Sequence, residues 1–198
     1  MTRIKGAFMQ TLRLQDLTKS LPVLDSTPIQ GLLQKELDKI PGKIVVLDDD
    51  PTGVQTVHDV YVYTDCTISS IREGFAQPGR LFYLLTNSRG LTEEETTTLH
   101  RQIALDLATV SRETHTPFQV ILRGDSTLRG HYPLEPLLMK ETLEDALSFR
   151  FDGEILCPFF LEGGRYTAGD VHYVEDRGQL IPAGETEFAK DKTFGYHA

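Results

Sequence analysis

The segment Ile44–Gly53 (IVVLDDDPTG) constrains the fold of this chain more than any other part of its sequence. Four apolar residues, three of them β-branched, run straight into three aspartates and then into a Pro-Thr-Gly turn. β-Branched apolar residues favour a buried strand. Three crowded carboxylates repel one another unless a metal, a cation, a proton or a polar ligand offsets their charge. The segment therefore predicts a core strand that ends at a functional site.

Further apolar runs alternate with helical patterns along the chain. We expect strands at Val60–Thr64, Arg80–Thr86, Pro117–Leu122 and Glu154–Cys157, and helices at Ile68–Phe75, from Thr92 to about Glu113, and after Pro133. Strands that alternate with helices in this way are typical of a mainly parallel sheet with helices on both faces. The sequence therefore predicts an α/β fold with three α/β/α layers.

Two capping boxes indicate where helices begin. Thr27 and Gln30 form the first, with Thr27 as N-cap, and the Pro41-Gly42 pair ends that helix. Thr92 and Glu95 form the second. The apolar residues of the first helix fall on one stripe, which consists of Ile29, Leu32, Leu33, Leu37 and Ile40.

The two ends of the chain carry weaker patterns. Residues 1–25 are expected to form an N-terminal extension, and residues 26–198 a single domain. Within that domain, Val171–Val174 and Gln179–Ile181 predict a small hairpin. The final stretch, GETEFAKDKTFGYHA, has no apolar element that closes a core, and we interpret it as a linker toward a further domain.

Composition narrows the classes of partner. The net charge of −9 over 198 residues argues against nucleic acid, because binding to phosphate backbones needs a basic face. A small anion is still compatible with this charge, since a few arginines can hold one locally. The chain has neither an apolar run long enough for a membrane span nor a secretory pattern at its start. Cys66 and Cys157 match no metal-binding spacing, and we interpret them as reduced thiols of a cytoplasmic protein.

Four polar loops follow the expected strands. Ligands of parallel α/β sheets bind beyond the carboxyl ends of the strands, so these loops are expected to meet at one edge. The candidate residues in them are Asp49, Asp50, Thr52, Gly53, Asn87, Ser88, Arg89, Arg123, Asp125, Ser126, Thr127, Arg129, Gly130, His131, Gly164 and Arg165. Both a structural and a catalytic role stay open for His131, and no residue is assigned to a metal.

The loop RGDSTLRGH (123–131) has the richest chemistry of the four. Arg123 and Arg129 are suited to binding a carboxylate or a phosphate, and the start of the next helix favours an anion. A purely structural interpretation also exists, in which Arg123 pairs with Asp125 while Ser126 and Thr127 cap the turn.

A phosphatase of the haloacid-dehalogenase type is one alternative. Asp48, Asp50 and Thr52 satisfy its D-x-D-x-T motif, and Thr86 fits the required Ser/Thr after the second strand. The chain has no lysine between positions 43 and 140, and Asp125 is the only acidic residue where that chemistry needs a Mg²⁺-binding pair. A phosphate-binding G-x-x-x-x-G-K-[ST] loop and a G-x-G-x-x-G dinucleotide motif are also missing from the sequence.

Five long motifs resemble the N-terminal domain of the four-carbon acid sugar kinases. They are LDDDPTGVQTVHDV (47–60), LLTNSRGL (84–91), RGDSTLRGHYPLE (123–135), CPFFLEGGRYTAGDVHYV (157–174) and PAGETEFAKDKTFGY (182–196). Their order and spacing also fit that family, so the resemblance covers about residues 40–198.

The resemblance implies part of an ATP-dependent kinase that phosphorylates the terminal hydroxyl of a sugar acid such as threonate, erythronate or 3-oxo-tetronate. In that family the N-terminal domain holds the sugar acid, and a C-terminal domain carries ATP with its Mg²⁺. Since the sequence stops near the junction between these two domains, we expect it to contain the part of the site that binds the sugar acid and to lack most of the ATP site. Asp49 or Asp125 is expected to orient the attacking hydroxyl. A non-catalytic sugar-acid-binding module is the other alternative.

Overall fold

The computed structural model describes residues 11–192, apart from residues 20, 24, 40 and 56. Its contacts divide the chain into two compact units. The parallel-sheet unit comprises Asp25–Asp125 and Arg129–Glu154, and the hairpin unit comprises, among described residues, 11–24, 126–128 and 155–192. No described helix combines the length and the hydropathy that crossing a bilayer requires.

The parallel-sheet unit is built on four strands in the order β3-β4-β2-β5, and every neighbouring pair is parallel. The strands are β2 (Lys43–Asp48), β3 (Tyr61–Tyr63), β4 (Leu81–Leu85) and β5 (Phe118–Arg123). Central β2 is buried along nearly its whole length, as its apolar run predicts. The edge strand β5 instead alternates half-buried and exposed residues over its first four positions.

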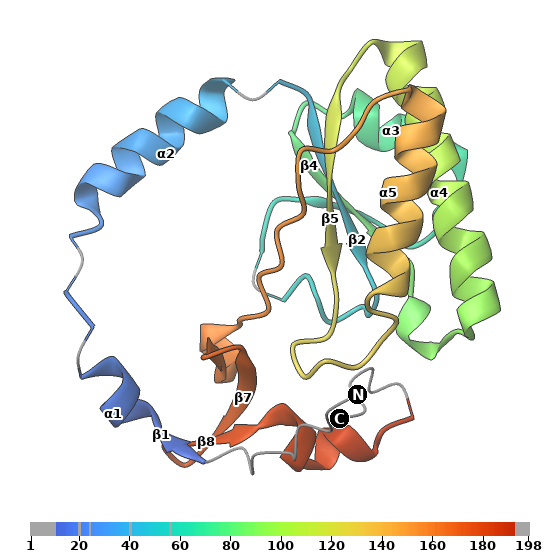
Figure 1. Cartoon of the computed structure of the whole chain (residues 1–198). Coiled ribbons are helices and arrows are strands. Elements are labelled where there is room, and N and C mark those ends of the chain that lie inside the picture. The colour runs from blue at the N-terminus through green and yellow to red at the C-terminus, as the bar shows by residue number, and fades with distance from the viewer. Residues whose placement is uncertain (1–10, 20, 24, 40, 56, 193–198) are drawn as a thin grey trace. The chain divides into compact units, whose positions relative to one another are not determined.

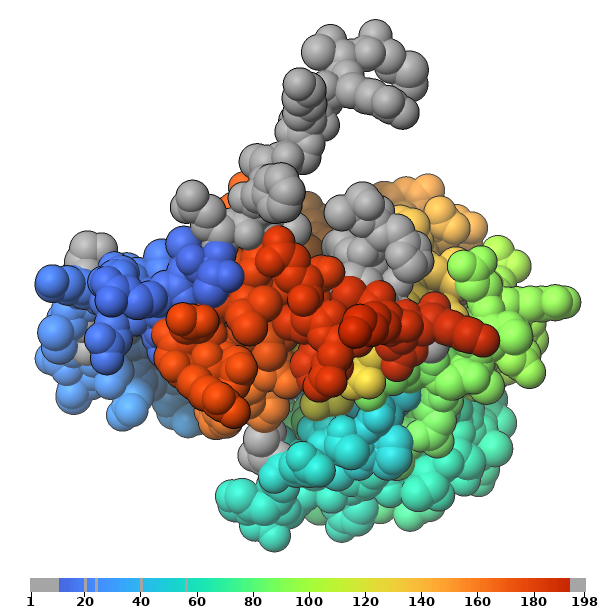
Figure 2. All heavy atoms as spheres, turned by 90° about the horizontal axis from the view of Figure 1, so that it is seen from below, coloured from blue at the N-terminus to red at the C-terminus, as the bar shows by residue number. Residues whose placement is uncertain are grey.

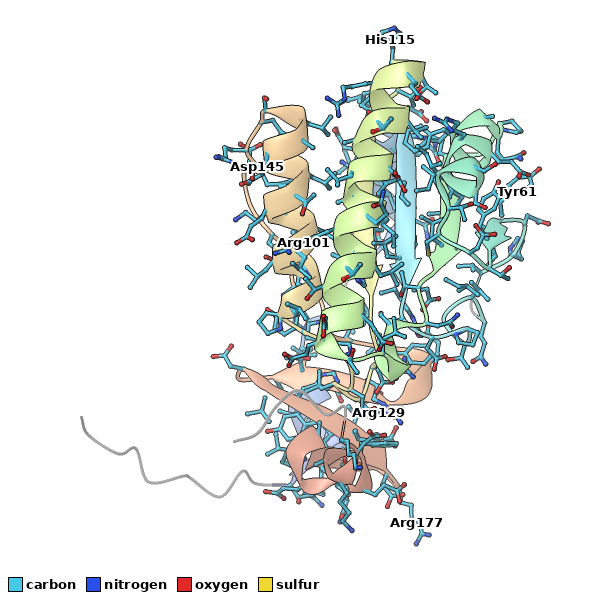
Figure 3. The ribbon with its side chains drawn as sticks, turned by 90° about the vertical axis from the view of Figure 1, so that its right-hand side faces the viewer. Tyr61, Arg101, His115, Arg129, Asp145 and Arg177 are labelled. Atoms are coloured by element: carbon cyan, nitrogen blue, oxygen red, sulfur yellow. The ribbon has the colours of Figure 1, made fainter. Side chains whose placement is uncertain are left out.

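Three helices pack on one side of this sheet, and the first helix of the unit lies apart on its other side, which confirms the α/β prediction (Figure 1). They are α2 (Thr27–Lys39), α3 (Ile68–Ala76), α4 (Glu93–Thr114) and α5 (Leu134–Leu147). Figure 3 shows α4, which carries Arg101, beside α5, which carries Asp145. A single apolar core joins α3, α4 and α5 to the sheet through Leu47, Phe82, Leu84, Ile103 and Leu107, among others.

The start of α4 confirms the second capping box. The Glu95 backbone N–H donates to Thr92 Oγ1 over 3.2 Å, and the Thr92 N–H donates to Glu95 Oε2 over 2.8 Å. Two backbone donors that the helix cannot satisfy are thereby paired. The loop before this cap carries Arg89.

The start of α2 differs from the prediction. Thr27 is already helical, and its backbone N–H donates over 3.0 Å to the carboxylate of Asp25. The expected apolar stripe is not buried, because Ile29, Leu32 and Leu33 are all more than half exposed. Ile40, which was expected to complete the stripe, lies outside the described residues.

The hairpin unit contains an antiparallel sheet in the order β1-β8-β7-β6. Its strands are β1 (Leu12–Arg13), β6 (Arg165–Ala168), β7 (Val171–Asp176) and β8 (Gln179–Pro182). The β7-β8 pair confirms the predicted hairpin. Leu12 pairs with Leu180, so the segment expected as an N-terminal extension contributes a strand, and Figure 2 shows the blue segment against the orange-red hairpin.

Short helical segments complete the chain. They are α1 (Leu14–Thr18), η1 (Ser88–Gly90), η2 (Leu161–Gly163), η3 (Ala183–Glu185) and η4 (Glu187–Lys190). Of these, η1 belongs to the parallel-sheet unit and follows β4 directly.

The prediction of a strand at Glu154–Cys157 was wrong. These residues are in no ladder, and Ile155 is 93% exposed. An apolar run becomes a strand only when a neighbouring strand satisfies its backbone groups. Pro158, which directly follows, has no N–H to donate to such a ladder.

Candidate functional site

Three of the four polar loops meet at the carboxyl edge of the parallel sheet. Asp48, the last residue of β2, lies in register with Leu85 of β4 and with Arg123 of β5. The three strands therefore deliver their following loops to the same place. Figure 3 shows Arg129 at this edge, at the opposite end of α4 from His115.

Arg89 joins the loops after β2 and β4. Its Nη2 lies 2.9 Å from Asp49 Oδ1, and its Nε lies 3.1 Å from Asp49 Oδ2, so the two groups form a bidentate pair. Its Nη1 donates to Asp50 Oδ2 over 2.6 Å. Asn87 enables this approach, because it adopts a left-handed φ of 51° and starts the tight turn η1. One guanidinium thus offsets two of the three consecutive carboxylates.

Arg129 and Asp125 form a second pair in the loop after β5. Arg129 Nε donates to Asp125 Oδ2 over 2.7 Å, and Arg129 Nη2 lies 3.3 Å from Asp125 Oδ1. Arg89 Nη2 also approaches Asp125 Oδ1 to 3.8 Å. Asp125 therefore lies between two cations, and the structure favours this pair over the Arg123–Asp125 pair of the structural interpretation.

Asp48 faces inward, away from solvent. It is 0% exposed, Arg123 Nη1 lies 3.4 Å from its Oδ1, and its Oδ2 has no hydrogen-bond partner. Burial raises the pKa of Asp48 to about 6, although the charge of Arg123 opposes the shift. A Cβ at position 53 would lie only 1.8 Å from Asp48 Oδ2, so the Gly53 backbone packs directly against this carboxylate.

The two neighbouring aspartates have opposite pKa shifts. Burial raises the pKa of Asp49, and the hydrogen bonds from Arg89 only partly offset this. Burial also raises the pKa of Asp50, but the hydrogen bonds from Thr52 and the charge of Arg89 lower it further, so the net shift is downward. Asp50 is thus the more firmly ionised of the pair.

His131 and Gly130 support the edge. His131 Nε2 lies 3.0 Å from the Leu91 carbonyl oxygen, which can only accept, so Nε2 donates. This bond ties the loop after β5 to the end of η1 and favours the structural role. A Cβ at Gly130, where φ is +116°, would lie 3.2 Å from Asp49 Oδ2, so glycine permits the close approach.

Four other candidates belong to the hairpin unit. The Ser126 carbonyl accepts from His172 Nε2 over 2.8 Å, and Thr127 is buried. Gly164 adopts φ +71° and sits against Glu175, while Arg165 lies over the Phe188 ring at 5.7 Å. Their part in ligand binding stays a prediction.

The parallel-sheet unit thus assembles four carboxylates (Asp48, Asp49, Asp50, Asp125) and three guanidiniums (Arg89, Arg123, Arg129) at one edge. Carboxylates accept hydrogen bonds from hydroxyls, and guanidiniums bind carboxylates or phosphates. Among the described residues, no three His, Cys, Asp or Glu side chains form a group that could hold a metal ion. The arrangement suits a small molecule with both hydroxyls and a negative charge.

The sequence-based candidates missed two residues behind this edge, His100 and Glu135. Both are buried, and they lie 3.5 Å apart. One signal was available, because each interrupts an apolar face with a polar group: His100 precedes Ile103 and Leu107 at helical spacing, and Glu135 precedes Leu138 in the same way.

Comparisons with known proteins agree with this chemistry. A family model described as a sugar-binding N-terminal domain matches residues 44–198, which includes both the aspartate-bearing β2 and the hairpin. A comparison with curated proteins finds no match. The family model covers most of the chain, and its description agrees with an edge suited to hydroxyl groups. The chain therefore belongs to the family of sugar-binding N-terminal domains.

Proposed function

We propose that the chain is the substrate-binding domain of an ATP-dependent kinase, and that it binds a four-carbon acid sugar of the threonate, erythronate or 3-oxo-tetronate type. The observation that carries the proposal is the pairing of aspartates with arginines at the carboxyl edge of β2, β4 and β5. A polyhydroxy carboxylate needs both kinds of group, acceptors for its hydroxyls and a cation for its carboxylate.

The proposed roles follow from exposure and pairing. Arg123 and Arg129 keep 30% and 25% of their side chains exposed, so they are our candidates for the ligand's carboxylate. Asp125 lies between the guanidiniums of Arg129 and Arg89 and is our choice to orient the attacking hydroxyl. Asp49, whose two oxygens both bind Arg89, would serve mainly to hold that guanidinium.

ATP and Mg²⁺ enter this proposal through the family resemblance. Phosphoryl transfer depends mostly on positioning and on charge stabilisation, and Mg²⁺ typically binds substrate phosphates with one or two carboxylates. We assign both to a C-terminal partner domain, and the present chain to the sugar acid.

A phosphatase that uses Asp48 as nucleophile has less support. Asp48 is fully buried beneath Gly53, so its carboxylate does not face a substrate. A generic phosphomonoester assay separates the two proposals. Turnover that disappears in Asp48→Asn would favour the phosphatase.

Calorimetry with threonate and erythronate tests binding. We expect millimolar or tighter binding by the wild type, and its loss in Asp125→Ala and Arg129→Ala. Erythritol, which has the hydroxyls without the carboxylate, is the matched ligand control and should bind much more weakly. Folded wild-type protein that binds none of these four-carbon acids would contradict the proposal. Binding without phosphoryl transfer, even with the C-terminal domain added, would favour a non-catalytic module.

A further inference from the structure

A chain of buried polar side chains runs behind the edge cluster, entirely within the parallel-sheet unit. It consists of Ser88 on η1, His100 on α4 and Glu135 on α5, with exposures of 0%, 1% and 8%. Ser88 Oγ donates to Glu135 Oε1 over 2.6 Å, and His100 Nε2 lies 3.5 Å from the same oxygen. Polar groups buried this deeply are costly unless every one has a partner.

Hydrogen-bond geometry determines where the protons lie. His100 Nδ1 is 2.9 Å from the Thr96 carbonyl oxygen, which can only accept, so Nδ1 carries a hydrogen. In a neutral ring, Nε2 would then present a lone pair to Glu135 Oε1, and the two would repel. A distance of 2.6 Å from Ser88 Oγ is typical of a hydroxyl that donates to an ionised carboxylate. The 3.5 Å approach of His100 Nε2 to the Glu135 carboxylate therefore favours a proton between the two groups.

Ser88 links this pair to the edge cluster. Its backbone N–H donates over 3.4 Å to Thr86 Oγ1, and Thr86 Oγ1 donates over 3.0 Å to the Asp48 carbonyl oxygen. The next residue, Arg89, donates from its backbone N–H to the Asp49 carbonyl oxygen over 3.3 Å. The orientation of η1, and with it the direction of the Arg89 guanidinium, is thus held from behind through Ser88.

We propose that His100 and Glu135 are a positioning pair, which shares one buried proton, anchors Ser88 and so aims Arg89 at Asp49 and Asp50. Both residues are buried and act on Arg89 through Ser88, while the charge of Glu135 also raises the pKa of Asp49 directly. As far as it concerns ligand affinity, the inference rests on the proposed sugar-acid site. Its structural part, the proton on His100 and the fixed Arg89, holds independently of any ligand.

Two NMR signals test the structural part on the whole chain. In the wild type we expect both ring nitrogens of His100 to resonate as protonated nitrogens, and the Arg89 Nε–H to be visible and slow to exchange. In Glu135→Gln, the Nε2 signal should move to the position of an unprotonated nitrogen, because no carboxylate faces it. The Arg89 Nε–H should broaden there and in Ser88→Ala.

The functional readout is threonate or erythronate affinity, whichever the wild type binds. We expect Glu135→Gln and Ser88→Ala each to weaken it about tenfold. Glu144→Gln is the matched control, since Glu144 is a buried glutamate of the same helix whose partners are Arg150 and the Phe151 N–H. That variant should leave the affinity, the His100 signals and the Arg89 signal as in the wild type.

Two outcomes would overturn the proposal. One is a wild-type spectrum in which His100 Nε2 is unprotonated. The other is Ser88→Ala or Glu135→Gln protein that is folded and keeps a sharp Arg89 signal and wild-type affinity. A wild type that binds no sugar acid would contradict the proposed function alone, because both NMR signals still decide the positioning role.

Discussion

Arg89 and Asp49 form a bidentate pair at the carboxyl edge of the sheet, with Nη2–Oδ1 at 2.9 Å and Nε–Oδ2 at 3.1 Å. The Asp49 side chain is only 5% exposed, so water contributes little to its solvation. The guanidinium therefore provides most of the stabilisation that this buried charge receives.

Arg89→Ala should destabilise the protein by about 3 kcal/mol, because it leaves Asp49 as an uncompensated buried charge. Urea denaturation measures the change in the free energy of unfolding. Adding Asp49→Asn to Arg89→Ala should recover at least about 1 kcal/mol, since the unpaired charge is then removed.

Arg72→Ala is the matched control for that experiment. Arg72 also forms a two-point pair, with Glu113, but both side chains are nearly half exposed. Its loss should cost less than about 1 kcal/mol. Equal destabilisation by the two arginine variants would contradict the role that we assign to burial.

Asp48→Asn should change how stability depends on pH. Burial raises the pKa of Asp48 from its ordinary value of 3.8 to about 6, so the folded protein binds this proton more tightly than the unfolded chain. The stability contributed by Asp48 is therefore complete below pH 4 and is lost as the pH rises through 6. Asparagine does not titrate there. The free energy of unfolding of the variant, relative to that of the wild type, should therefore rise by about 2 kcal/mol between pH 4 and pH 7.

Thermal and urea unfolding at a series of pH values measure this difference. If the difference in free energy of unfolding between Asp48→Asn and the wild type stayed constant from pH 4 to pH 7, Asp48 would titrate normally. The sign of the change is also informative. If rising pH increased the free energy of unfolding of the wild type relative to that of the variant, the folded state would stabilise the Asp48 charge.

Gly53→Ala should destabilise the protein by about 2 kcal/mol, because the new methyl group would meet the buried Asp48 carboxylate. That carboxylate is itself held by Arg123 and cannot move into solvent without losing this contact. Gly124→Ala at the same sheet edge is the control, since no atom lies within 4 Å of its added Cβ. Similar unfolding midpoints for the two alanine variants would refute the close packing at Gly53.

The two cysteines should differ sharply in reactivity. Burial, together with the neighbouring Asp65 charge, raises the pKa of the Cys66 thiol to about 12, whereas Cys157 is exposed. Because the thiolate is the reactive form, iodoacetamide at pH 8 should alkylate one cysteine of the native protein. Mass spectrometry should locate the modification at Cys157. Both should react in denaturant, and rapid native labelling of Cys66 would contradict this environment.

Local sequence signals were sufficient for most of the parallel-sheet unit. The β-branched run before Asp48 became the central strand, and the Thr92–Glu95 box became the cap of α4. These elements depend on interactions between residues close in the chain, or on burial that an apolar run makes favourable by itself. The convergence of the loops after β2, β4 and β5 also followed, since carboxyl ends of parallel strands share one edge.

Two predictions failed where an element depends on a distant partner. Glu154–Cys157 has the apolar character of a core strand, but it is in no ladder, and its apolar residues are exposed. The stripe of α2 is regular, yet Ile29, Leu32 and Leu33 are not buried. Periodicity reports which residues share a face, and it does not report whether another element covers that face.

The sequence by itself determined the α/β class, the polar edge and the residue types there, which suit hydroxyl groups and a negative charge. Only the tertiary structure decided which charges pair: Arg89 with Asp49 and Asp50, Arg129 with Asp125, and Arg123 with the buried Asp48. It also brought His100 and Glu135, which lie on different helices, behind Ser88. Pairing depends on distances of a few ångströms between residues far apart in the chain, and only the packing of strands and helices sets those distances.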